Sequence, residues 1–72
     1  TTSTVALIGI MLQDLAEARR EMGDLTGAVR GYEEALQIRK QLLEKDQKNL
    51  THRRRIFTLH FALASTLGNP HG

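Results

Sequence analysis

The sequence of 72 residues contains no cysteine, which excludes disulfides and thiolate metal sites. A chain without cysteine fits a reducing compartment, and we expect a cytoplasmic protein. Long hydrophobic runs are also missing, because the longest, residues 5–12, has eight residues where a membrane span needs about 20. No basic segment precedes this run, so a signal peptide is not expected either. These absences predict a protein without membrane association.

Proline occurs once, at residue 70, so no proline interrupts a helix earlier in the chain. Apolar residues recur mostly at steps of three and four, a period that is typical of helices. This pattern predicts three helices, over residues 4–22, 25–45 and 50–67.

Glycine and short polar residues mark the ends of these helices. Gly23 is expected to end the first helix, and Asp24 to cap the second, because its carboxylate can accept N–H groups of the first turn. The polar segment 46–49 is expected to form the next turn. Gly27 and Gly31 lie inside the second predicted helix, where each costs about 1 kcal/mol relative to alanine. They are either exposed and tolerated, or they let a neighbouring helix approach closely.

The turn sequence GDLTG, after the first predicted helix, has a counterpart in GNPHG at residues 68–72. The first glycines of the two pentapeptides are 45 residues apart, and the same shift superimposes several further apolar residues. In the second copy Asn69 is a good N-cap and Pro70 a good first residue of a helix. We therefore expect a single domain of one and a half repeats, with residues 4–49 as the first repeat and residues 50–72 as the start of the second.

The residues around the first turn form the most specific motif in the chain. The first predicted helix contains LxxLA and the second contains AxxxYxxAL, and together they resemble the helix-turn-helix of the tetratricopeptide repeat family. The residues that carry the resemblance are Leu12, Leu15, Ala16, Gly23, Ala28, Tyr32, Ala35 and Leu36. The period of 45 is similar to that of longer variants, such as those of kinesin light chains and bacterial signalling proteins. Leu12 stands where the family pattern has an aromatic residue, Arg19 where it has tyrosine, and Lys40 where proline usually ends the second helix.

The resemblance implies an all-α fold, an α-solenoid fragment of three antiparallel helices. Small residues would let the helices sit close, while Leu12, Leu15, Tyr32 and Leu36 fill the space around them. It also implies a non-catalytic scaffold that binds a protein or peptide on a concave face lined by the first helix of each repeat. The face implied for this chain comprises Ile10, Gln13, Asp14, Glu17, Arg20, Glu21 and Arg55. Its acidic members either receive a basic segment or form a solvated helix face.

Charge is distributed unevenly along the chain. Residues 1–36 contain six acidic and three basic residues, a net charge of −3, whereas residues 37–72 contain two acidic and seven basic residues, a net charge of +5. One and a half repeats are also fewer than the three or so that usually bury a continuous core. We therefore expect either a fragment of a longer array or self-association as a homodimer or higher oligomer, with the acidic half of one copy on the basic half of another.

A small basic module that binds nucleic acid is the alternative hypothesis, because Arg53, Arg54 and Arg55 are consecutive and lysines lie nearby. Residues 52–55 spread over about 300° of a helix, however, and no aromatic platform for RNA accompanies them. A nucleic-acid partner is therefore less favoured than a protein. We expect no enzyme, cofactor or metal site, because no nucleophile lies in a motif with histidine and acid, and His52 and His60 are about 12 Å apart along a helix.

Overall fold

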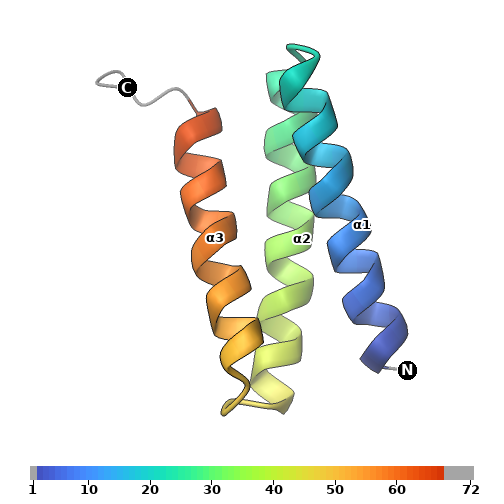
Figure 1. Cartoon of the computed structure of the whole chain (residues 1–72), viewed down its shortest axis with the longest axis vertical. Helices are drawn as coiled ribbons and strands as arrows, with labels where there is room; N and C mark the ends of the chain where they lie inside the picture. Colours follow the sequence, from blue (N-terminus) through green and yellow to red (C-terminus); the bar gives the residue numbers. More distant parts are fainter. Residues whose placement is uncertain (1, 68–72) are drawn as a thin grey trace.

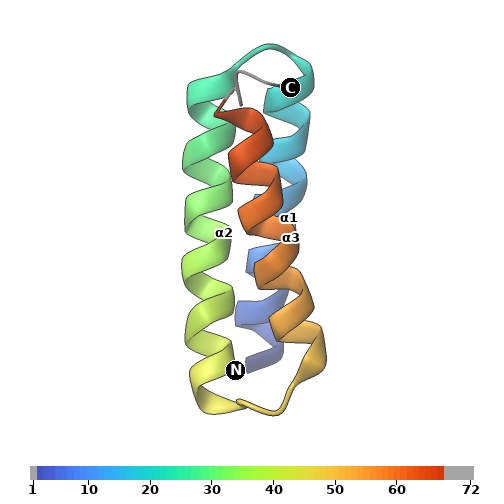
Figure 2. The same cartoon turned by 90° about the vertical axis from the view of Figure 1, so that its left-hand side faces the viewer.

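The computed structural model describes residues 2–67, and within them the chain forms three α-helices. They are α1 (Thr2–Glu21), α2 (Leu25–Lys45) and α3 (Leu50–Thr66). Figure 1 shows that consecutive helices run antiparallel, and Figure 2 shows that α1 and α3 lie on the same side of α2. The predicted all-α fold of three antiparallel helices is confirmed, with bounds within two residues of those expected. The predicted cap Asn69 and the following Pro70 lie outside the described residues.

Local backbone geometry and two side-chain caps fix the turns. Gly23 has a φ of 89°, a left-handed conformation that glycine adopts without steric cost. Beside it, Asp24 Oδ1 accepts a hydrogen bond from the backbone N–H of Gly27 at 3.0 Å, so the predicted cap of α2 is confirmed. At the second turn, Asn49 Oδ1 accepts a hydrogen bond from the N–H of His52 at 3.1 Å. Residues next to each turn therefore determine where α2 and α3 begin.

Helices α1 and α2 approach closely where Gly31 faces Ala16. Both residues are buried, and a methyl group at Gly31 would lie only 2.9 Å from the Ala16 Cβ. Contacts that short are essentially absent between real Cβ atoms, so glycine is needed at this position. Of the two possibilities for the glycines inside α2, close helix approach applies to Gly31. Gly27 is half-buried and lies against the carboxylate of Asp24 instead.

The core lies along α2 and is built mainly from small residues. Its buried members are Ala16, Ala28, Tyr32, Ala35, Leu36 and Leu59. The expectation that Leu15 fills the space around the alanines is wrong, because Leu15 is 48% exposed. Adjacent residues in a helix are separated by about 100° around its axis. Packing Ala16 against α2 therefore directs Leu15 outward.

A pair of glycine substitutions tests the close approach of α1 and α2. A methyl group at the buried Gly9 would lie 3.4 Å from Ile38 Cγ2, an ordinary contact, against 2.9 Å from Ala16 at Gly31. Gly9→Ala and Gly31→Ala both gain about 1 kcal/mol of helix propensity, but only the second forces the helices apart. In urea denaturation we expect G9A to exceed G31A in the free energy of unfolding by about 1–3 kcal/mol. Equal stability of the two variants would contradict a tight contact at Gly31.

Candidate functional site

A groove of about 260 Å³ runs between α1 and α3, with α2 as its floor. Helices α1 and α3 flank α2 (Figure 1), and the side chains that line the groove come from all three helices. The residues that line it are Gln13, Glu17, Arg20 and Glu21 of α1, Tyr32 of α2, and Thr58, Phe61 and Ala62 of α3. One wall is thus mostly polar and charged, and the other is mostly apolar.

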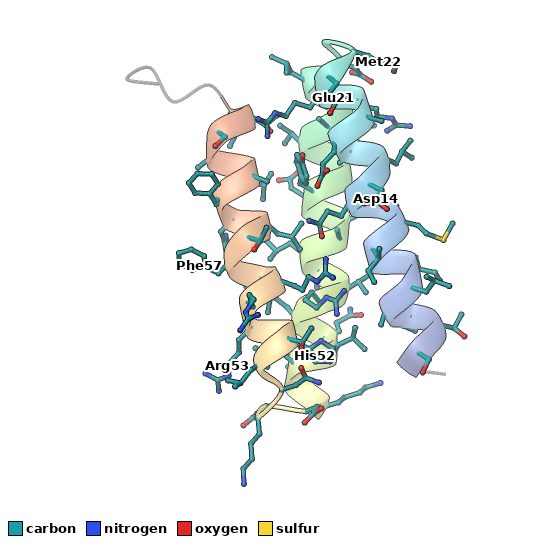
Figure 3. The ribbon with its side chains drawn as sticks, in the orientation of Figure 1. Asp14, Glu21, Met22, His52, Arg53 and Phe57 are labelled. Carbon is teal, nitrogen blue, oxygen red and sulfur yellow. The ribbon has the colours of Figure 1, made fainter. Side chains whose placement is uncertain are left out.

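The groove gathers four of the seven residues that the sequence placed on a binding face: Gln13, Glu17, Arg20 and Glu21. Asp14 is exposed on α1, which also carries Glu21 (Figure 3). Ile10 and Arg55 are half-buried, on α1 and α3 respectively. Arg55 lies one turn before Thr58, so both residues border the same side of α3.

Tyr32 contributes an unpaired hydroxyl to the floor of the groove. Its side chain is completely buried, and its Oη has no hydrogen-bond partner. Thr66, near the end of α3, has a buried and unpaired Oγ1 as well. A buried hydroxyl without a partner costs about 1–3 kcal/mol, because it has lost its hydrogen bonds to water. Both groups are therefore local sources of instability.

Arg39 of α2 is a charged side chain in the interior, with only 4% of its surface exposed. Its Nη1 donates a hydrogen bond to Nδ1 of His52 in α3 at 3.0 Å. Because arginine has no acceptor, the His52 Nδ1 must be unprotonated, and a neutral His52 carries its proton on Nε2. On the other side, a methyl group at Gly9 of α1 would lie 3.9 Å from Arg39 Nη2. The guanidinium therefore borders both neighbouring helices.

The charge of Arg39 is not balanced by an acidic side chain. No carboxylate within residues 2–67 forms a salt bridge with it. Burial, and then the positive charge of Arg55, lower the pKa of Arg39 from its ordinary value. This part of the molecule therefore holds two arginines without a counter-charge.

The basic run of α3 is split between different environments. Arg53 donates two hydrogen bonds, at 3.0 and 2.9 Å, to the backbone carbonyl of Gln47. Figure 3 shows Phe57 on the side of α3 that faces away from α1 and α2, whereas Arg53 lines a hollow together with Lys40, Leu43 and Glu44 of α2. Arg54 is exposed, whereas His52 is buried and Arg55 is half-buried. The arginines thus form no single basic surface of the kind that positions a phosphate backbone.

Sequence reasoning missed the pairing of Arg39 with His52. It assigned no role to Arg39 and considered His52 only as a metal ligand or as part of the basic run. A usable signal was present, because Ala28, Tyr32, Ala35 and Arg39 follow one another at steps of four, three and four and so share one side of α2. A charged residue in that series is expected to lie in the interior.

Two further surfaces are apolar and exposed. On α1 they are formed by Leu7, Ile8, Met11 and Leu15, and on α3 by Leu50, Phe57 and Phe61, each with 45 to 75% of its surface exposed. These residues recur at helical spacing, so each helix presents one continuous apolar strip. Large contiguous apolar patches are uncommon on the surfaces of monomeric soluble proteins.

The described residues contain neither a metal site nor a helix that could cross a membrane. Within residues 2–67, no three histidine, aspartate or glutamate side chains lie close enough together to hold a metal ion. None of the three described helices has the length and hydropathy required to cross a membrane. No family model, no curated protein and no solved structure matches the chain significantly.

Removing the unpaired hydroxyls should stabilise the protein. Tyr32→Phe and Thr66→Val each delete a buried hydroxyl that has no partner, so we expect each to raise the free energy of unfolding by about 1 kcal/mol in chemical denaturation. Thr58→Val is the matched control, because the exposed Thr58 hydroxyl donates to the carbonyl of Arg54 at 3.0 Å. A loss of stability in Y32F and T66V as large as in T58V would contradict the assignment.

Proposed function

We propose that the chain is a non-catalytic protein-interaction module of the tetratricopeptide type, and that the groove between α1 and α3 binds a peptide. The observation that supports this most is the groove itself, which joins four residues of the implied binding face to an apolar wall at Phe61 and Ala62. A compartment without disulfide formation, such as the cytoplasm, suits a chain that has no cysteine.

The wall formed by α1 determines the kind of peptide. Glu17 and Glu21 are exposed carboxylates on one side of α1, and Asp14 lies one turn before Glu17. Arg20, between the two glutamates in sequence, neutralises only part of this charge. Phe61 on the opposite wall offers an apolar surface. A peptide that combines basic and apolar side chains is therefore complementary to this end of the groove.

Reversing one groove charge tests the proposal. In a panel of immobilised short peptides we expect the protein to retain peptides that contain both basic and apolar residues. Glu17→Lys should weaken their binding about tenfold, because it replaces an attractive charge by a repulsive one. Glu34→Lys is the matched control, since Glu34 is exposed on α2 and does not line the groove.

Two outcomes would contradict a peptide groove. One is the absence of binding to every peptide in the panel. The other is a salt-dependent gel shift with nucleic acid that is abolished when Arg53, Arg54 and Arg55 are changed to glutamate, since this would favour the nucleic-acid hypothesis.

We further propose that the two exposed apolar strips bind each other in different copies of the chain, head to tail. Their flanking charges are opposite: Asp14 lies one turn from Met11 on α1, and Arg54 lies one turn from Phe57 on α3. A contact between α1 of one copy and α3 of the next therefore joins apolar surface to apolar surface and acid to base. A contact between two copies of the same strip would bring like charges together.

Two complementary variants distinguish this arrangement from a symmetric dimer. Met11→Glu damages only the α1 strip and Phe57→Glu only the α3 strip, and both side chains are exposed, so both variants should fold. In sedimentation at low salt we expect the native chain to associate, each variant alone to be monomeric, and an equal mixture to form a heterodimer through the two intact strips. A native chain that stays monomeric at high concentration, or a mixture that stays monomeric, would contradict the head-to-tail contact.

A further inference from the structure

The arginine pair lies in line with the groove, beyond the end that holds Gln13 and Thr58 and away from the glutamates. Arg39 follows Tyr32 by seven residues, so it lies about 10 Å farther along α2 on the same side. Arg55 precedes Thr58 by one turn on α3, and Gly9 precedes Gln13 by one turn on α1. All three helices therefore continue from the residues that line the groove to the residues around the Arg39 guanidinium.

This cluster of Arg39, His52 and Arg55 is incomplete in electrostatic terms. An interior cation is expected to be paired with an acid, because removing a charge from water is costly. Here the hydrogen-bond partner of Arg39 is the imidazole of His52, which accepts through Nδ1, and its charged neighbour Arg55 has the same sign. No acid within the described part of the chain forms a salt bridge with Arg39. The missing component is one negative charge.

We propose that the cluster of Arg39, His52 and Arg55 is a binding subsite for a carboxylate of a peptide, so that one ligand places an acidic group there and a basic group beside Glu17 and Glu21. Arg55, which is half-buried, is the donor that the ligand reaches, and its planar guanidinium suits a carboxylate. Arg39, which is buried, adds positive charge from the interior of the protein. This inference rests on the proposed function. It adds where the acidic and the basic group of the ligand bind and how far apart the two charges lie.

The geometry also determines the spacing of the two charges in the ligand. Glu17 and Glu21 lie eight and twelve residues beyond Gly9, which borders the Arg39 guanidinium. At 1.5 Å per residue these positions are about 12 and 18 Å away along α1. An extended peptide advances about 3.3 Å per residue, so its acidic and basic residues should be about four or five positions apart.

Labelled synthetic peptides test this spacing directly. Each carries one glutamate and one arginine in a serine and glycine background, with the two charges adjacent, about four positions apart or about eight positions apart. By fluorescence anisotropy at low salt we expect the intermediate spacing to bind about tenfold more tightly than the other two. Equal affinity at all three spacings would overturn the carboxylate subsite.

Two variants at the cluster provide a second test of the carboxylate subsite. Arg55→Glu should lose about tenfold in affinity for the best glutamate–arginine peptide and gain affinity for a peptide with arginine at both positions, a gain that a misfolded protein cannot show. Arg39→Met should weaken binding while raising the thermal midpoint, because it removes a buried charge. Arg30→Glu makes the same charge change on the exposed part of α2, outside the groove and both apolar strips, and should leave the affinity nearly unchanged.

The failure of this inference is distinguishable from the failure of the peptide groove. If Glu17→Lys weakens peptide binding but R55E and R39M bind every peptide as the native protein does, the groove stands and the carboxylate subsite is wrong. If R55E weakens all peptides equally without gaining affinity for the doubly basic one, Arg55 has a structural role and the subsite is also wrong. If no peptide binds, both proposals fall.

Discussion

The contact between Gly31 and Ala16 is the constraint on which the rest of the structure depends. Because only the methyl group of Ala16 separates the two backbones at this point, α1 lies close on α2 rather than on a layer of large residues. The same alignment of the two antiparallel helices brings Gly9 beside Arg39 and leaves Gln13 and Glu17 facing the channel that α3 closes. The groove is thus a consequence of how closely the first helix pair packs.

A core in which three of six members are alanines contributes little hydrophobic stabilisation, so the cost of its buried polar groups matters. A chain of this size buries only about 60% of its unfolded surface, so its stability is marginal. Even so, its interior holds the Arg39 cation and the unpaired hydroxyls of Tyr32 and Thr66. Tyr32 lies in the floor of the groove, and Arg39 borders both α1 and α3 farther along α2. Groups that lower stability and gather along one channel are typical of a binding site, where the contribution of the ligand offsets their cost.

Features determined by neighbouring residues could be predicted from the sequence, and features determined by the packing of helices could not. The positions of the three helices, the stop at Gly23 and the cap at Asp24 depend on residues within one turn of each other, so the pattern identified them. Helical periodicity alone does not determine which side of a helix faces its neighbours. Leu15 and Phe57 both fit the period, and only the placement of α2 leaves them exposed. The burial of Arg39 was missed for a related reason, since its stem packs like an apolar side chain while its charge suggests exposure.

The groove and the apolar strips are connected through Phe61. This side chain is mostly exposed and belongs to the strip on α3, yet it also lines the groove opposite Glu17 and Glu21. A second copy that packs on α3 would cover Phe61 from outside and restrict the positions open to its ring. The same ring then forms a firmer wall for a peptide, so less conformational entropy is lost when the peptide binds. Association and peptide binding are therefore expected to strengthen each other, and by linkage each must raise the affinity of the other by the same factor.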